Sequence, residues 1–382
     1  MEIIGRNVSA NGDRRSVDST ASLDRECGVE RPRPKTVLVT GAAGFIGYHV
    51  AQALLARGDA VVGVDNLNAY YDPKLKADRL ARLRPHPEFR FARLDLADRG
   101  AVHALFGEHG FDHVVHLAAQ AGVRHSIRQP HDYLSSNLAG FLHVLESCRH
   151  HSVHHLVYAS SSSVYGANAR MPFAEDQGTD HPLSLYAATK KSNELMAHCY
   201  SALYGFATTG LRFFTVYGPW GRPDMALFTF TQAILSGRPI EVYHGGAHRR
   251  DFTYIDDVVR GVLAALDRPA TADPDWDAMQ PDPGRSRVPY RIYNIGNQRP
   301  IELSRYIEVL ERCLGRQAVK RLLPMQPGDV PDTWSNVDRL AQEVGYRPDT
   351  SIEVGVRRFV DWYLEYYGTT AEPTVRAAAS GR

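Results

Sequence analysis

The stretch TVLVTGAAGFIG, residues 36–47, constrains the fold more than any other part of the chain. An apolar, β-branched run leads into a turn with three glycines, and an amphipathic stretch follows the turn. Between a strand and a helix, such glycines allow a tight turn and let a pyrophosphate approach the N-terminus of the helix. The turn residues predicted to bind a dinucleotide are Gly41, Gly44, Phe45, Ile46 and Gly47.

Further cofactor contacts are predicted where the next apolar runs end. Asp65 follows Gly47 by eighteen residues, and a carboxylate at this place can accept both ribose hydroxyls of NAD and repel a 2′-phosphate. NAD is therefore favoured over NADP. Asp95 is placed to accept a hydrogen bond from the adenine amine, and a cap for a helix that starts near Ala97 is an alternative role compatible with the first. The predicted cofactor residues of these segments are Asp65, Asn66, Asp95, Leu96, Ala118, Ala119 and Gln120.

Short apolar runs alternate with amphipathic stretches from Lys35 onward, which is typical of parallel βα units. We expect an α/β fold, with a Rossmann-like doubly wound parallel sheet that binds ligands at the carboxyl ends of its strands. A smaller mixed α/β substrate-binding domain should follow. The polar loop at 268–287 is expected to carry no packing. The predicted organisation is a disordered tail at 1–34, an NAD-binding Rossmann domain at 35–205, a mainly substrate-binding domain at 206–368 with segments that return to the sheet, and a tail at 369–382.

Composition excludes several classes of function. Forty-four Lys and Arg against forty-three Asp and Glu leave a formal charge of +1, which gives no general attraction to nucleic acid or membrane. No apolar run approaches the ~20 residues that span a bilayer. The four cysteines are far apart and lack metal-ligand spacing, so we predict no metal site and a reducing, cytoplasmic location.

The motif YAATK places Tyr186 and Lys190 on one face of a predicted helix. A tyrosine with a pKa of ~10 is a poor base at neutral pH. An adjacent ammonium and a positively charged nicotinamide ring both favour the phenolate, so Tyr186 is expected to act as acid and base. Both residues are also predicted to contact the cofactor.

The order of glycine turn, serine run, Tyr and Lys resembles the extended short-chain dehydrogenase/reductase family over roughly residues 35–367. The resemblance implies that a hydroxyl at the end of the fifth strand donates to the substrate oxygen. In YASSSSVYG this position corresponds to Ser161. The predicted catalytic residues are therefore Ser161, Tyr186 and Lys190.

The rest of the serine run separates activities within that family. Sugar-nucleotide 4,6-dehydratases carry Asp-Glu where this chain has Ser162 and Ser163, and UDP-glucuronate decarboxylases carry Glu at the second place. Without these acids, the resemblance implies hydride transfer at C4 of the sugar, which is the reaction of a 4-epimerase.

Other stretches, PWGRPDM at 219–225 above all, are similar to UDP-glucuronate 4-epimerases. The resemblance implies a UDP-sugar substrate whose carboxylate is held by Thr215 opposite Ser161 and Ser162. Arg222 and Arg250 are candidates for the diphosphate, and Arg124 for either the phosphates or the carboxylate. The predicted substrate-binding residues are Arg124, Ser161, Ser162, Ser163, Thr215, Arg222, Arg250 and Asp329.

Alternatives remain open from the sequence alone. A UDP-glucose 4-epimerase or a UDP-glucuronate decarboxylase is the nearest rival, and a non-catalytic dinucleotide-binding sensor belongs to a different class. The resemblance also implies a homodimer, formed through two helices at about 131–150 and 184–204.

Overall fold

The computed structural model describes residues 34–324 and 332–368. The described residues from Lys35 onward belong to one compact unit. The predicted tails at 1–34 and 369–382 lie almost wholly outside the described residues, and so does Asp329.

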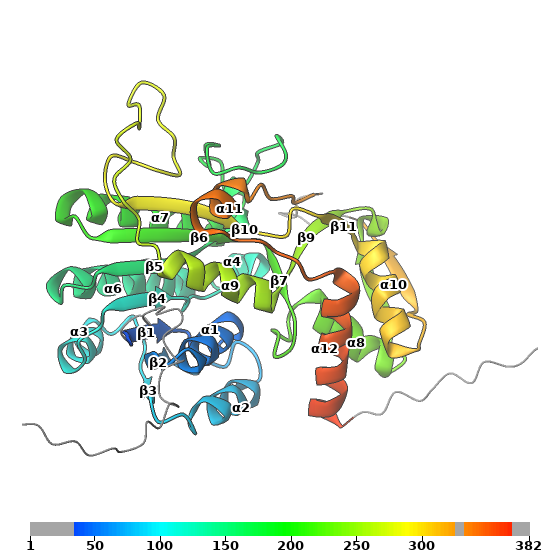
Figure 1. Cartoon of the computed structure of the whole chain (residues 1–382). Coiled ribbons are helices and arrows are strands. Elements are labelled where there is room, and N and C mark those ends of the chain that lie inside the picture. The colour runs from blue at the N-terminus through cyan, green and yellow to red at the C-terminus, as the bar shows by residue number, and fades with distance from the viewer. Residues whose placement is uncertain (1–33, 325–331, 369–382) are drawn as a thin grey trace, which may run out of the picture. The chain divides into compact units, whose positions relative to one another are not determined.

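The central element is a seven-stranded sheet in which every pair of neighbouring strands is parallel. Its strand order is β10-β6-β5-β4-β1-β2-β3, so the order reverses between β1 and β4 (Figure 1). This is the doubly wound arrangement, which binds ligands at the switch point. Its strands are β1 (Thr36–Thr40), β2 (Ala60–Asp65), β3 (Phe89–Arg93), β4 (His113–His116), β5 (His155–Ser161), β6 (Ala207–Phe213) and β10 (Tyr290–Ile295).

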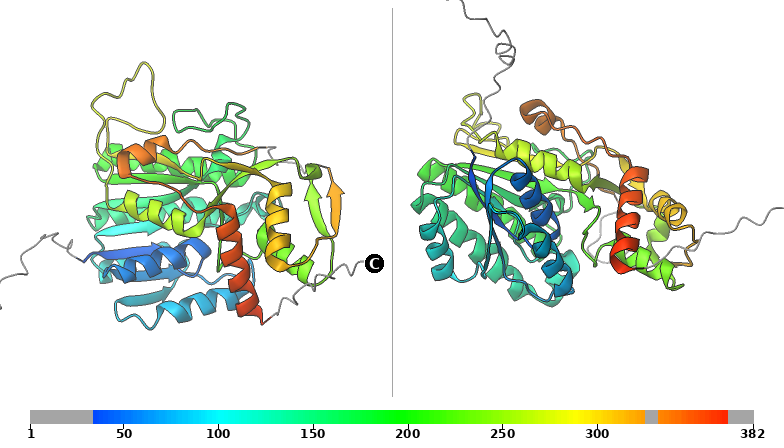
Figure 2. Two further views of the ribbon diagram at one scale, coloured as in Figure 1. Left: turned by 45° about the vertical axis from the view of Figure 1, so that its right-hand side comes forward. Right: turned by 60° about the horizontal axis from the view of Figure 1, so that its bottom comes forward.

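Helices cover both faces of this sheet, as the two views in Figure 2 show. Successive side chains of a strand point to opposite faces. Accordingly Val37 and Val39 pack in one apolar cluster, whereas Leu38 packs in another. The first cluster includes helices α1 (Phe45–Ala56), α2 (Pro73–Leu83) and α9 (Ile255–Leu266), and the second includes α3 (Arg99–Glu108), α6 (Gly140–His150) and α7 (Leu185–Tyr204).

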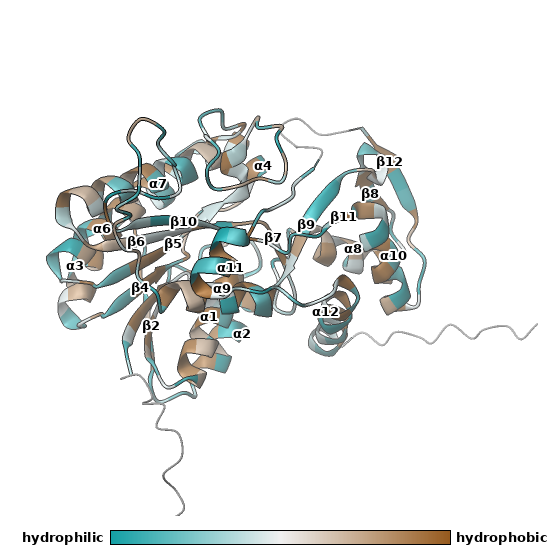
Figure 3. Cartoon of the chain, turned by 45° about the horizontal axis from the view of Figure 1, so that its top comes forward, coloured by the Kyte–Doolittle hydropathy of each residue, from teal (hydrophilic) through white to brown (hydrophobic). Residues whose placement is uncertain are grey.

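A smaller group of elements lies beyond β6 in sequence. Helix α8 (Ala226–Leu235), which is largely brown in Figure 3, contacts α10 (Leu303–Leu314), and α10 contacts α12 (Ile352–Tyr367). Two of the strands after residue 205, β6 and β10, belong to the large sheet. The remaining strands form two small sheets: β7 (Thr215–Tyr217), β9 (Arg249–Tyr254) and β11 (Pro300–Glu302) in one, and β8 (Ile240–Tyr243) and β12 (Lys320–Leu323) in the other.

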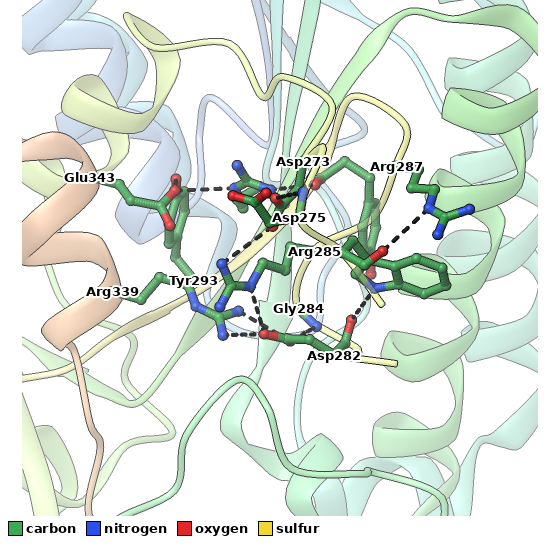
Figure 4. A network of polar contacts seen from close by, with 12 residues as sticks. Asp273, Asp275, Asp282, Gly284, Arg285, Arg287, Tyr293, Arg339 and Glu343 are labelled. Atoms are coloured by element: carbon green, nitrogen blue, oxygen red, sulfur yellow. Dashed lines mark hydrogen bonds and ion pairs between the residues drawn. The ribbon is translucent and has the colours of Figure 1, made fainter. Parts of the chain in front are cut away.

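The expectation that the loop at 268–287 carries no packing is wrong, because the loop contacts the edge of the large sheet. Arg285 forms an antiparallel bridge with Arg291 of β10, the strand at the edge of the large sheet. Asp282 accepts hydrogen bonds from Arg285 Nε at 2.8 Å and Arg339 Nη2 at 2.6 Å (Figure 4). Arg339 belongs to α11 (Asp338–Val344). Charge-assisted hydrogen bonds thus hold a polar segment against the sheet edge, where composition alone indicates only a solvated loop.

Candidate active site

The glycine turn connects β1 to α1 and forms one wall of a cavity at the switch point of the sheet. Gly41 has a φ of +72°, a conformation that favours glycine. A Cβ on Gly47 would lie 2.0 Å from the carbonyl oxygen of Gly41, and a Cβ on Gly41 would lie 2.9 Å from the backbone nitrogen of Ala118. Gly44, the N-cap of α1, has no side chain to occupy the first N–H groups of the helix. The turn therefore leaves a helix N-terminus open to an anion.

The carboxyl ends of β2 and β3 form the second wall. Asn66 Nδ2 donates to Asp95 Oδ2 at 3.0 Å, and the backbone N–H of Ala97 donates to Asp95 Oδ1 at 2.9 Å. The alternative that Asp95 caps a helix is wrong, because α3 begins at Arg99 and its N-cap is Asp98. The side chain of Asp95 instead closes a short turn with Ala97 that precedes α3. Asp95 lines the cavity together with Asp65.

Residues that follow β4 complete the cofactor end. Ala118 and Ala119 line the cavity with Gln120, whose Nε2 is buried and has no hydrogen-bond partner among the described residues. A buried amide donor without a partner is unusual in a folded protein and indicates a ligand. The open helix N-terminus and this donor fit a dinucleotide. The cavity is lined by every residue predicted to bind the cofactor: Gly41, Gly44, Phe45, Ile46, Gly47, Asp65, Asn66, Asp95, Leu96, Ala118, Ala119, Gln120, Tyr186 and Lys190.

Helix α7 brings the predicted acid–base residues to this cavity. The helix begins after Ser184, whose hydroxyl accepts from the backbone N–H of Ala187 at 3.1 Å. Lys190 is 2% exposed, and its ammonium donates to the carbonyl oxygen of Ala159 on β5 at 2.9 Å. Ser161, at the end of β5, lines the cavity together with Tyr186. The three predicted catalytic residues thus meet at one wall.

The electrostatics at Tyr186 differ from the expectation. Burial raises the pKa of the Tyr186 hydroxyl, while the hydrogen bond with Ser161 and the charge of Arg222 lower it less. Lys190 is not among the groups that lower this pKa; burial lowers the pKa of its own ammonium to about 8. In the protein alone, Tyr186 therefore favours the protonated phenol.

A buried ion pair beneath the catalytic residues escaped the sequence analysis. Glu194 of α7 accepts a hydrogen bond from Ser160 at 2.6 Å and two from Arg212 of β6, at 2.8 and 2.9 Å. Arg212 and Glu194 are 0% and 2% exposed. This contact ties the start of the serine run to the helix that carries Tyr186. The spacing of Glu194, one helical turn after Lys190, places Glu194 on the same face of α7, but it does not indicate Arg212 as the partner.

The predicted substrate residues divide between two cavities. Arg222 lines the first cavity beside Tyr186 and pairs with Asp224, which also accepts from Tyr70 at 3.1 Å. Arg124 lies on α4 (Val123–Arg128) with its guanidinium 5.5 Å from the ring centre of Tyr243, and it lines neither cavity. The second cavity is lined by Ser162, Ser163, Thr215 and Arg250, together with Thr333.

Fold and cavity together define a Rossmann-type enzyme with a cavity at the switch point of its sheet. The chain belongs to the NAD dependent epimerase/dehydratase family, whose model matches residues 37–296. Membership confirms the predicted NAD dependence and the predicted Rossmann-like fold.

Individual relatives are close over most of the chain. The chain is 52% identical over 331 residues to Protein CapI of Staphylococcus aureus, covering 87% of this chain and 99% of that protein. It is 49% identical over 350 residues to UDP-glucuronate 4-epimerase 4 of Arabidopsis thaliana, covering 89% of this chain and 78% of that protein. The structure of UDP-glucuronic acid 4-epimerase from Bacillus cereus with UDP-glucuronic acid and NAD matches with a TM-score of 0.78 at 33% identity, over 87% of this chain and 100% of that one.

Membrane-spanning helices and metal-ligand clusters are both absent from residues 34–324 and 332–368. No helix in this part of the chain is long and apolar enough to cross a membrane. No three His, Cys, Asp or Glu side chains there gather closely enough to hold a metal ion.

Proposed function

We propose that this chain epimerises UDP-glucuronate to UDP-galacturonate at C4 of the sugar, with NAD as its bound cofactor. The named relatives and the solved complex with UDP-glucuronic acid support this substrate. The observation that carries the proposal is the placement of Ser161, Tyr186 and Lys190 at one wall of the dinucleotide cavity.

The distribution of acids favours epimerisation over elimination. Among the described residues that line the two cavities, the only carboxylates are Asp65 and Asp95, both at the ends of β2 and β3. Eliminating water from the sugar requires a further acid and base beside the reacting carbons. The wall near Tyr186 offers hydroxyl groups instead.

Each catalytic residue then has a separate role. Ser161 donates a hydrogen bond to the C4 oxygen, and Tyr186 removes the proton of the C4 hydroxyl and later returns one. NAD held at the glycine turn and Asp65 would supply the acceptor for the C4 hydride and the donor for its return, so there would be no net oxidation. The charge of Arg222 lowers the Tyr186 pKa that burial raises. The positive charge of a bound nicotinamide ring would lower this pKa further and make the phenolate available. Lys190, held by Ala159, keeps its ammonium in the same cavity.

The substrate carboxylate needs its own control. The 4-keto intermediate is a β-keto acid, which loses carbon dioxide when the breaking bond lies perpendicular to the ketone plane. Ser162 and Thr215 line the second cavity, next in sequence to Ser161 and Val216 of the first. Their hydroxyls are proposed to hold the carboxylate out of that alignment. Arg222 and Arg250 are proposed to hold the diphosphate, and Arg124 and Asp329 stay predicted substrate contacts.

The product of the reaction tests the proposal. After UDP-glucuronate is incubated with the purified protein, NMR should show an equilibrium mixture of UDP-glucuronate and UDP-galacturonate. A UDP-pentose with carbon dioxide would indicate a decarboxylase, and conversion of UDP-glucose alone would indicate the other epimerase. Bound dinucleotide without any conversion would favour the non-catalytic sensor.

Assembly and location are part of the proposal. Leu142 of α6 and Leu195 and Leu203 of α7 are 39%, 56% and 72% exposed, which supports a homodimer through these helices. Light scattering should give twice the mass of the chain. Cys148, Cys199 and Cys313 form no disulfide in the described residues, which fits the proposed cytoplasmic location.

A further inference from the structure

Lys76 is a buried cation in the wall of the cofactor cavity and has no role in the proposed reaction. It lies on the inner face of α2 and is 5% exposed. Its ammonium donates to Asn68 Oδ1 at 2.9 Å, and it lies 3.5 Å from Asp65 Oδ1 and 5.2 Å from the ring centre of Tyr71. Lysine is rarely buried without a paired charge. Its place beside Asp65 therefore has a bearing on what binds there.

The contacts of Asp65 show how Lys76 acts on it. Oδ1 accepts the backbone N–H of Leu67 at 2.8 Å and is the oxygen nearest to Lys76. Within the described part of the chain, Oδ2 has no hydrogen-bond partner. One oxygen is thus anchored, and the other keeps its lone pairs for a ribose hydroxyl. Lys76 also holds Asn68, whose Nδ2 lies 3.4 Å from Gln120 Oε1 across the same cavity.

The local charge balance follows from this geometry. The Asp65 carboxylate repels a 2′-phosphate, but the ammonium beside it would attract one. With both groups charged, the pair has no net charge. Because the carboxylate stands at the ribose position, it decides whether a 2′-phosphate is repelled or attracted. Burial lowers the pKa of Lys76, while the charge of Asp65 opposes that shift.

We propose that Lys76 is a specificity-determining residue of the cofactor site: it holds Asp65 in position to select NAD, and it becomes a binding group for a 2′-phosphate once the Asp65 charge is removed. The inference rests on the dinucleotide site and does not depend on which sugar the enzyme converts.

Arg93 provides a matched control. Its Cα pairs with that of Asp65 in the register of β2 and β3, so Arg93 is a cation that stands beside Asp65 on the neighbouring strand. Its side chain is exposed and does not line the cavity. A nearby arginine is the usual partner of a 2′-phosphate in this kind of fold. The two cations can therefore be separated by mutation.

The experiment measures the dissociation constants of NAD and NADP, by calorimetry on dinucleotide-stripped protein, for six forms of the chain. These are the wild type, Asp65→Asn, Lys76→Gln, Asp65→Asn/Lys76→Gln, Asp65→Asn/Lys76→Arg and Asp65→Asn/Arg93→Gln. A hydrogen bond to a charged group changes affinity by about 10- to 100-fold. Asp65→Asn should therefore bind NADP at least ~10-fold more tightly than the wild type does.

Three comparisons decide the proposal. Lys76→Gln should remove the gain in NADP affinity from Asp65→Asn, Lys76→Arg should keep it, and Arg93→Gln should leave it unchanged. Lys76→Gln alone should weaken the binding of NAD, and it should bind NADP even less tightly than the wild type does. If Lys76→Gln does not fold by circular dichroism, Lys76→Met replaces it, because Met fills the same volume without charge.

The contrary results are distinct. The proposal is overturned if Asp65→Asn gains no NADP affinity, if the gain survives Lys76→Gln, or if Arg93→Gln abolishes it. A wild type that binds neither dinucleotide would instead overturn the cofactor site itself.

Discussion

Removing the carboxylate of Glu194 is expected to destabilise the protein strongly. In Glu194→Ala, the fully buried guanidinium of Arg212 loses two hydrogen bonds and Ser160 loses its acceptor. Breaking a buried pair from one side costs about 3–5 kcal/mol, because the remaining charge is left without compensation. At roughly 2 °C per kcal/mol for a large domain, the melting temperature should fall by roughly 6–10 °C.

The assay is a thermal melt followed by circular dichroism with saturating NAD, together with two matched variants. Glu146→Ala removes a partly exposed carboxylate that pairs with Arg149 and accepts a hydrogen bond from Tyr200, and we expect a smaller fall in the melting temperature than for Glu194→Ala. Glu194→Met/Arg212→Met removes both charges and should recover most of the loss, because an apolar pair of similar volume needs no compensation. Equal melting temperatures for Glu194→Ala and Glu146→Ala would refute the reasoning, and so would a double variant as unstable as Glu194→Ala.

Three further predictions concern the site. Burial lowers the pKa of Lys190 to about 8, so its ammonium loses its proton as pH rises through this value and kcat/KM of the wild type should fall above it. In Lys190→Arg the fall should move to higher pH. A pH profile that does not move would exclude the Lys190 ammonium as the group responsible for the fall. Thr215→Val should raise the fraction of UDP-pentose in the NMR product spectrum, and wild-type product ratios would remove its proposed role. Gly47→Ala should lose most bound NAD on desalting, measured by chromatography of the released dinucleotide, because the new Cβ would meet the Gly41 carbonyl at 2.0 Å; full retention would contradict the turn geometry.

Local pattern was sufficient to predict the cofactor end of the cavity. Gly41 follows β1, Asp65 is the last residue of β2, and Ala118 lies two residues after the end of β4. Parallel strands place their carboxyl ends at one edge of the sheet. The four-residue spacing of Tyr186 and Lys190 likewise fixes their common helix face. Such inferences need only chain order and the geometry of single elements.

Pairings between distant segments could not be predicted in this way. Arg212 meets Glu194 because β6 lies beside β5, and Lys76 meets Asp65 because α2 folds back over the end of β2. The sequence of the loop at 268–287 indicates a solvated segment, because its contact with Arg339 of α11 depends on the folded chain. The raised pKa of Tyr186 has the same origin, since burial depends on how the whole chain packs.

The fate of the hydrogen on C4 tests the central claim most directly. UDP-glucuronate deuterated at C4 should give UDP-galacturonate that keeps its deuterium at C4 when the reaction is run in ordinary water with unlabelled NAD in the medium, because the hydride leaves and returns within one cavity. Tyr186→Phe should slow this conversion at least ~100-fold, as expected for loss of a positioned acid–base group. Loss of the deuterium to water, or conversion at the wild-type rate without the Tyr186 hydroxyl, would contradict the account.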